Sequence, residues 1–257
     1  MIYFFKNEFR EDRLQPMQLG IKAPCLRQGA GFFETMLYNG RSISSLDPHM
    51  DRLYASMDTF SLDYRKIPVE DKAMALLAKN HLEKGQARID VVYPVMDFNQ
   101  KIEPLLVVEA YEPQPKKEYA LAVYPRVHVS YLSQHRSLSH LHFVLADQYA
   151  VRQGCDESVL LDPLGNILET PDASLIFYDG SAFYSPPHGP SLQAISLSRA
   201  MQVLPVREET IPLRSLDSFR HMYRVNSLTG VKPVVRLGDF TFEPDWQNAN
   251  LASIHIL

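Results

Sequence analysis

The sequence predicts an α/β (α+β) protein with two lobes joined by an extended linker. Helix-like and strand-like patterns fill residues 1–111, and the segment EPQPKKE at residues 112–118 then interrupts them. Proline fixes φ and removes a backbone donor, so this segment favours an extended conformation. We therefore expect a small N-terminal α/β domain over residues 1–113 and a larger C-terminal domain over residues 117–257.

Length, composition and charge favour an ordinary globular protein. The 257 residues are 46% hydrophobic and 22% charged, close to the globular average, and a chain of this length buries roughly three quarters of its unfolded surface. The net charge of −4 argues against a nucleic-acid partner, which needs a basic face. The first apolar run is too short for a signal peptide or a membrane span, so we expect no membrane partner and a cytoplasmic location.

Two amphipathic helices are expected in the N-terminal domain. Asp47 would cap the first, and Pro48 would take the first helical position, where a missing N–H costs nothing. Apolar residues then recur on one face at helical spacing: Met50, Leu53, Tyr54, Met57 and Phe60. The second helix would cover residues 69–84 and end at Gly85.

Strands rich in β-branched and aromatic residues flank the linker. They are expected at residues 87–95 and 105–111 before it and 119–127 after it. A helix over residues 138–153 would then end at Gly154. Short strands follow around a Pro/Gly turn at residues 163–166, with expected bounds of 158–162, 167–170, 174–178 and 182–185.

Simple catalytic and metal-binding motifs are scarce. Four histidines lie close in sequence but lack the i, i+4 spacing of helix-borne ligands, so no metal is expected: His128, His135, His140 and His142. Neither a G-x-G-x-x-G nor a P-loop motif occurs. The segment NSLTG at residues 226–230 offers backbone N–H groups and hydroxyls suited to a phosphate, although the same pattern also fits an ordinary turn.

Six segments in a consistent order resemble the class IV aminotransferases, the pyridoxal-phosphate enzymes of fold type IV. They are GAGFFET at 29–35, LDPHMDRL at 46–53, the helix and GCDE within 146–161, GNILE at 165–169, SPP at 185–187 and NSLTGVKPV at 226–234. The family includes branched-chain aminotransferase, D-amino acid aminotransferase and aminodeoxychorismate lyase. The resemblance implies a small N-terminal α/β lobe, a larger C-terminal lobe with a barrel-like sheet, and a homodimer.

The resemblance also implies roles for five residues. Arg52 matches the arginine that binds the cofactor phosphate, a task suited to a bidentate guanidinium. Glu169 matches the carboxylate that faces the pyridine nitrogen and keeps it protonated. Ser227 matches a phosphate-contacting hydroxyl, and Ser196 and Ser198 lie where the family opens a helix on the phosphate.

One position departs from the family in its central chemistry. The catalytic lysine of the family aligns with Arg136, and no lysine lies between Lys117 and Lys232. A lysine amine can lose its proton, attack the cofactor aldehyde and move the substrate proton. A guanidinium stays protonated and does neither. Lys232, near the Ser227 segment, is the one stand-in that the sequence offers.

Three hypotheses follow from this departure. In the first, ordinary transamination is lost and pyridoxal phosphate, or a similar phosphorylated ligand, binds non-covalently through Arg52, Ser227 and Arg136. In the second, an active enzyme acts on an amino acid or chorismate-type substrate through Lys232, a partner chain's residue or a lysine-free mechanism. In the third, the chain is a structural or interaction dimer without a ligand.

Overall fold

The chain forms two compact units in the computed structural model, which describes residues 1–112, 116–127, 130–187, 192 and 194–257. The N-terminal unit comprises Met1–Pro113 and His135–His140, and the C-terminal unit comprises Gln114–Gln134 and Leu141–Leu257. The chain thus returns to the N-terminal unit for six residues after it has entered the C-terminal one. Residues 113–115 of the predicted linker lie outside the described residues.

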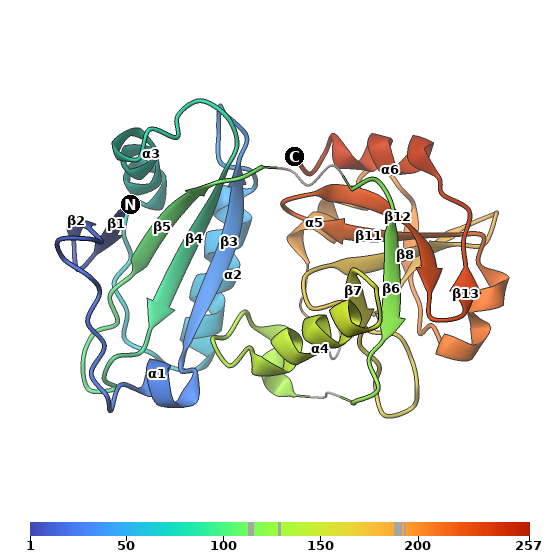
Figure 1. The fold of residues 1–257 in the computed structure, drawn as a ribbon, viewed down its shortest axis with the longest axis horizontal. Helices are drawn as coiled ribbons and strands as arrows, with labels where there is room; N and C mark the ends of the chain where they lie inside the picture. The colour runs from blue at the N-terminus through green and yellow to red at the C-terminus, as the bar shows by residue number, and fades with distance from the viewer. Residues whose placement is uncertain (113–115, 128–129, 188–191, 193) are drawn as a thin grey trace. The chain divides into compact units, whose positions relative to one another are not determined.

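The N-terminal unit is an antiparallel sheet covered by helices (Figure 1). Its strands lie in the order β2-β1-β5-β4-β3, with the bounds β1 Ile2–Phe5, β2 Glu8–Glu11, β3 Gly31–Tyr38, β4 Ala87–Pro94 and β5 Leu105–Ala110. Helix α2 (Leu46–Thr59) contacts β3, and helix α3 (Val69–Lys79) contacts β1 and β5. A short helix α1 (Pro24–Gln28) precedes β3. The apolar faces of the helices and the sheet form one buried core.

The predicted cap of α2 was wrong by two residues. Ser45 occupies the N-cap, in a left-handed conformation (φ 53°), and the helix begins at Leu46. Asp47 instead lies within the first turn, where its negative charge interacts favourably with the positive end of the helix dipole. Pro48 also lies in that turn, whose N–H groups have no partner within the helix.

Helix α3 ends at Lys79, five residues earlier than predicted. Asn80 at its C-cap exchanges two hydrogen bonds with the backbone of Ile2, each 2.7 Å long. The next residue, His81, has φ 59° and leaves the helical path. A contact with β1, distant in sequence, therefore ends the helix, and Gly85 belongs to the loop before β4 rather than to a helix cap.

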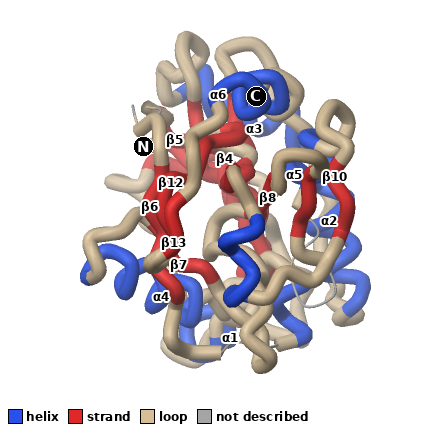
Figure 2. The backbone as a smooth tube through the Cα atoms, turned by 90° about the vertical axis from the view of Figure 1, so that its right-hand side faces the viewer, coloured by secondary structure: helices blue, strands red, loops and turns tan. Residues whose placement is uncertain are grey.

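The C-terminal unit is built on a mixed eight-stranded sheet in the order β10-β9-β8-β11-β12-β6-β7, with β13 paired to β12. Figure 2 shows β6, β7 and β12 together in this sheet. The bounds are β6 Tyr119–Val123, β7 Glu157–Val159, β8 Ser174–Tyr178, β9 Phe183–Ser185, β10 Val206–Glu208, β11 His221–Asn226, β12 Gly230–Leu237 and β13 Phe240–Thr241. The segments after β7 and β10 are joined where Ile167 N donates to Ile211 O (2.8 Å).

Helices and short 3₁₀ turns complete this unit. They are η1 Tyr131–Gln134, α4 Leu141–Arg152, α5 Ile195–Ala200, η2 Leu213–Ser218 and α6 Trp246–Ser253. Helix α4 contacts β6 and β7, and α6 contacts β12. Successive side chains of β11 point to opposite faces of the sheet. Met222 therefore packs in a hydrophobic cluster on one face, and Tyr223 packs in a separate cluster on the opposite face. None of the helices in the described part of the chain is long and apolar enough to cross a membrane.

Several predicted elements of this unit are shorter in the structure. Strand β6 ends at Val123 instead of residue 127, and residues 167–170 contribute one bridge, Leu161 to Ile167, rather than a strand. Helix α4 begins at Leu141 because residues 138–140 belong to the N-terminal unit. It ends at Arg152, one residue before the predicted end, and Gly154 adopts φ 65° in the turn that follows, as expected of a glycine after a helix.

Candidate functional site

The residues singled out by the sequence fall into two groups, one in each unit. The N-terminal unit holds Arg52 and Arg136, and the C-terminal unit holds Glu169, Ser196, Ser198, Ser227 and Lys232.

The backbone around Arg136 is fixed to the edge strand β3. Phe33 N donates to Arg136 O (2.8 Å), and Leu138 N donates to Gly31 O (2.9 Å). Gly31 has φ 140°, and a Cβ there would lie 2.5 Å from Tyr93 O, so only glycine permits this close approach. The segment of residues 136–138 is therefore held by two hydrogen bonds to the edge strand of this sheet, one of them made by residue 136 itself.

The Arg136 guanidinium has no acidic partner. It lies over the Phe33 ring at 5.7 Å from the centroid, and its Nε is buried without a hydrogen-bond acceptor. Within the described ranges it makes no ion pair or hydrogen bond. A partly buried cation without an acceptor is costly to keep, so this group is suited to receive an anion.

Arg52 is oriented by a buried carboxylate. Its Nε donates to Glu34 Oε1 (2.6 Å) and its Nη2 donates to Glu34 Oε2 (2.7 Å), in the bidentate geometry of strong charge-assisted pairs. Glu34 is 1% exposed. Burial alone would raise the pKa of Glu34, but hydrogen bonds from His49 and Arg52 and the charge of Arg52 lower it to about 2. Glu34 is thus ionised at neutral pH and fixes one side of the Arg52 fork.

His49 completes this cluster as a neutral imidazole. Burial lowers its pKa, the contact with Glu34 opposes this shift, and the charges of Arg52 and Arg136 add to the lowering. Because an ionised carboxylate only accepts, we assign the proton to Nδ1, which donates to Glu34 Oε2 (2.7 Å). Of the two guanidinium groups only that of Arg52 pairs with Glu34, while the charge of Arg136 acts on His49. With one carboxylate and two arginines, this group of four side chains carries a net positive charge.

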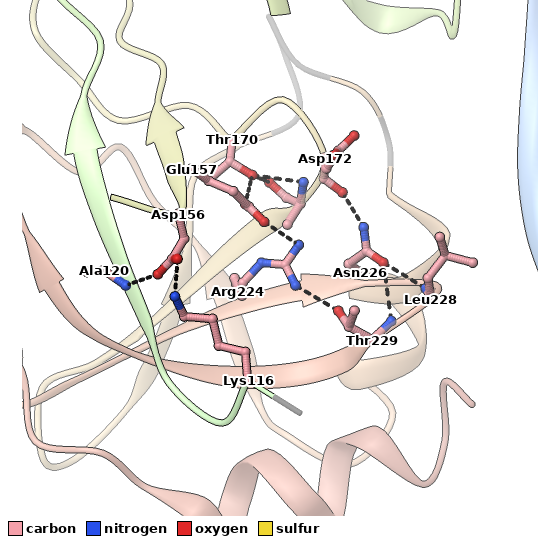
Figure 3. Close-up of polar contacts among 11 residues, drawn as sticks. Lys116, Ala120, Asp156, Glu157, Thr170, Asp172, Arg224, Asn226, Leu228 and Thr229 are labelled. Atoms are coloured by element: carbon pink, nitrogen blue, oxygen red, sulfur yellow. Dashed lines mark hydrogen bonds and ion pairs between the residues drawn. The ribbon is translucent and has the colours of Figure 1, made fainter. Parts of the chain in front are cut away.

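In the C-terminal unit, the turn after β11 is shaped by Asn226. Its Oδ1 accepts from Leu228 N (2.7 Å) and Thr229 N (3.3 Å), and its Nδ2 donates to Asp172 O (2.6 Å). Figure 3 shows these contacts. Ser227 is half-buried in the turn, and its hydroxyl has no hydrogen-bond partner among the residues that the structure describes. This hydroxyl is available to a ligand.

The sequence reasoning missed Arg224, the most buried cation near this turn. It is 2% exposed, its Nη2 pairs with Glu157 Oε1 at 2.7 Å, and its Nη1 donates to Thr229 Oγ1 at 2.7 Å. Its guanidinium lies 4.5 Å from the centroid of the Tyr119 ring. The available signal was an arginine between apolar residues in the strand sequence HMYRVN, where a charge needs a partner.

The remaining predicted cofactor residues have different surroundings. Glu169 is half-buried, and its backbone O accepts from Leu160 N (2.9 Å). Ser196 is buried in α5, where a helix was expected. Ser198 is exposed, and its hydroxyl donates to Ala194 O (3.2 Å), which leaves Ser196 the better placed of the two serines to offer a hydroxyl. Their contacts with a cofactor stay predictions.

Lys232 lies directly opposite Arg224 in the antiparallel pair β11–β12. Opposed residues of such a pair project from the same face of the sheet. The lysine is half-buried and forms no ion pair in the part of the chain that the structure describes. The register thus places the stand-in lysine beside the buried arginine, on the face where Glu157 and Tyr119 contact that arginine.

Asp147 on α4 gives a prediction about stability and pH. Burial and the negative charges of Asp172 and Glu157 raise its pKa to about 7, although Arg224 opposes this shift. Its Oδ1 is buried without a hydrogen-bond partner. Because folding raises the pKa of this carboxyl from 3.8, the folded protein becomes less stable relative to the unfolded chain as pH rises from about 4 to 7.

The Asp147→Asn variant should therefore be more stable than the wild type at pH 8, by about 1 kcal/mol once its partial solvent exposure is allowed for. Urea unfolding at several pH values measures the difference, which should grow between pH 4 and 7 and then level off. The exposed Asp217→Asn variant is the control. A difference that is the same at every pH would contradict the explanation.

Comparison with known proteins adds the family and the fold. The family described as Amino-transferase class IV matches residues 31–237. No curated protein matches the chain.

Three solved structures illustrate the shared fold. A branched-chain aminotransferase from the archaeon Thermoproteus uzoniensis, solved with norvaline, is 16% identical, with a TM-score of 0.88 over 99% of this chain and 93% of that one. A putative 4-amino-4-deoxychorismate lyase from Legionella pneumophila is 20% identical, with a TM-score of 0.81 over 95% of each chain. The branched-chain aminotransferase of Escherichia coli is 17% identical, with a TM-score of 0.83 over 93% of this chain and 87% of that one. At these identities the likeness establishes the fold, which confirms the fold type IV expectation.

Proposed function

The chain belongs to the class IV aminotransferase family, and we propose that it has lost lysine-dependent transamination but still binds pyridoxal phosphate, or a similar phosphorylated ligand, non-covalently. One observation carries this proposal. Arg136 stands where the resemblance places the catalytic lysine, and its guanidinium has no acceptor within the described residues. An unpaired cation at that position favours an anionic ligand over covalent chemistry.

The other residues fit a phosphorylated ligand. The N-terminal cluster is net positive because it holds the guanidinium groups of Arg52 and Arg136 but only one carboxylate, that of Glu34, which pairs with Arg52. In the C-terminal unit, the Ser227 hydroxyl has no partner among the described residues and lies in a turn fixed by Asn226. When bound, pyridoxal phosphate supplies a ring that accepts electrons from a substrate. Arg136 stays protonated, so it can orient an anion but cannot act as the base in such a reaction.

Binding of two cofactor forms tests the proposal. Pyridoxine 5′-phosphate has an alcohol in place of the reactive aldehyde of pyridoxal 5′-phosphate, so non-covalent binding predicts Kd values within about threefold of each other. Fluorescence titration of the purified chain measures both. Arg136→Met should weaken both by about tenfold or more, as expected for loss of a charged contact. The exposed Arg13→Met variant is the matched control.

A marked preference for the aldehyde form, accompanied by a visible absorbance band, would contradict the proposal. That result would favour the second candidate, an active enzyme resembling aminodeoxychorismate lyase or an amino-acid aminotransferase. The observation that favours it is the register of Lys232 opposite Arg224. Turnover of an amino acid or chorismate-type substrate should then survive Arg136→Ala and be lost in Lys232→Ala. Insensitivity to both variants would point to a partner chain's residue or a lysine-free mechanism.

A structural or interaction dimer without a ligand is the third candidate. A ligand that binds only the native state must raise its stability, so a Tm unchanged by saturating pyridoxal phosphate would favour this alternative. The proposal includes a homodimer, which rests on the family resemblance, and a cytoplasmic location, which rests on the short first apolar run of the sequence. Sedimentation velocity of the purified chain tests the dimer.

A further inference from the structure

The Ser227 loop, residues 226–230, is anchored to the rest of the C-terminal unit at both ends. Asn226 Nδ2 donates to Asp172 O at the start of the loop (2.6 Å). Arg224 Nη1 donates to Thr229 Oγ1 near its end (2.7 Å). Both anchors appear in Figure 3, with Ser227 between them in the sequence. The two contacts therefore enclose the hydroxyl that is available to a ligand.

Arg224 joins this loop to the strand and turn that follow α4. Its second terminal nitrogen pairs with Glu157 on β7, and Glu157 Oε2 accepts from Thr170 Oγ1 (2.8 Å). Thr170 in turn accepts from Ala173 N (2.9 Å), next to the Asp172 carbonyl that holds Asn226. The contacts form a closed circuit from one end of the loop to the other.

A buried arginine is a poor choice for stability alone. Its desolvation cost commonly offsets the gain from its ion pair, and apolar residues of similar volume often do as well or better. Arg224 is buried at this desolvation cost, and its Nε is buried without a hydrogen-bond acceptor as well. The benefit that offsets the cost is geometric, because a planar guanidinium fixes two acceptors at a set angle.

We propose that Arg224 is a positioning residue that holds the Ser227 loop in the shape that binds the phosphate of the ligand. This inference rests on the proposed function. Arg224 acts through Thr229 and does not itself contact the ligand. Glu157 neutralises its charge, so the effect on binding comes from the order of the loop rather than from added positive potential.

Variants at Thr229 test this inference without removing a buried charge. Thr229→Val keeps the shape of the side chain but removes the acceptor for Arg224, and should raise the Kd for both inorganic phosphate and pyridoxine 5′-phosphate by about tenfold. Thr229→Ser restores the hydroxyl and should return the Kd to near the wild-type value. Thr241→Val, on β13 of the same unit, is the matched control and should leave the Kd unchanged.

A double-mutant cycle shows whether Thr229 acts through Arg224. In the Arg224→Met background, Thr229→Val should have no further effect on the Kd, whereas independent roles would make the two losses multiply. Either that multiplication or equal Kd values for the wild type, Thr229→Val and Thr229→Ser would overturn the inference and leave the proposed function standing. Absence of binding by the wild-type chain would overturn the proposed function, and the positioning role with it.

Discussion

Arg136→Lys should convert a non-covalent ligand site into one that reacts with the aldehyde of pyridoxal phosphate. The segment of residues 136–138 is fixed to β3 by two hydrogen bonds, so a lysine at residue 136 would stand where the resemblance places the catalytic lysine. Its amine can lose a proton and attack the aldehyde, which the guanidinium cannot do. We expect a visible absorbance band with pyridoxal phosphate and, after borohydride reduction, a labelled peptide containing position 136.

The extent of labelling at position 136 distinguishes a specific reaction from a non-specific one. Labelling of position 136 should be close to stoichiometric in the variant, and pyridoxine 5′-phosphate should compete with it. Arg126→Lys adds an amine at an exposed position of the other unit and controls for indiscriminate reaction of surface lysines. If the label in Arg136→Lys appears mainly on Lys232, the assignment of position 136 is wrong.

Glu34→Gln should cause the largest loss of stability among the variants considered. Glu34 is 1% exposed and accepts three hydrogen bonds, two from Arg52 and one from His49. The amide keeps the shape of the side chain but removes the charge, so the Arg52 guanidinium loses its ion pair with Glu34. Removing one partner of a buried pair costs about 3–5 kcal/mol. Urea unfolding measures this loss, and the half-exposed pair of Arg65 and Glu103 provides the control variant Glu103→Gln, which should cost about 1 kcal/mol or less.

The pH dependence of the same pair gives a second measure of it. The pKa of Glu34 falls from its ordinary 4.5 to about 2 in the folded chain. The unfolded chain therefore binds more protons in this range, and the contribution of Glu34 is complete above pH 4.5 and is lost as pH falls toward 2. The shift corresponds to about 3 kcal/mol. Acid unfolding of Glu34→Gln should lack this component, and an unchanged acid limb would contradict the ion-pair explanation.

Local sequence patterns predicted the elements whose limits are set locally. Strand β8 has the bounds expected from its apolar run, and Gly154 ends α4 as a left-handed glycine should. Limits set by distant contacts were missed. Helix α3 stops early because Asn80 hydrogen-bonds Ile2, 78 residues away in sequence, and α4 starts late because the segment before it pairs with β3. Single-sequence patterns contain no signal for either contact.

The residues of the candidate site also fall into those that local sequence predicts and those that only contacts between distant residues reveal. Motif resemblance predicted Arg52 and Ser227, because each lies in a short segment that resembles the family, and alignment of the catalytic lysine predicted Arg136; the roles of all three stay predictions. Motif resemblance did not reveal that Glu34 fixes Arg52, since the two residues belong to different elements and meet only through packing. Arg224 was missed for the same reason, as its partners Glu157 and Thr229 come from β7 and the loop after β11. A charged residue within an otherwise apolar strand sequence is the signal that would have indicated Arg224.

Borohydride trapping of the wild-type chain with pyridoxal phosphate tests the central claim most directly. The chain would be mixed with sub-stoichiometric pyridoxal phosphate, with and without excess pyridoxine 5′-phosphate, then reduced and mapped by peptide mass spectrometry. We expect no lysine whose labelling is specific and blocked by the competitor, although fluorescence titration of the same chain with excess pyridoxal phosphate should show saturable binding. A single lysine labelled specifically, with Lys232 the first candidate, would show a covalent enzyme and contradict the loss of lysine chemistry at this site.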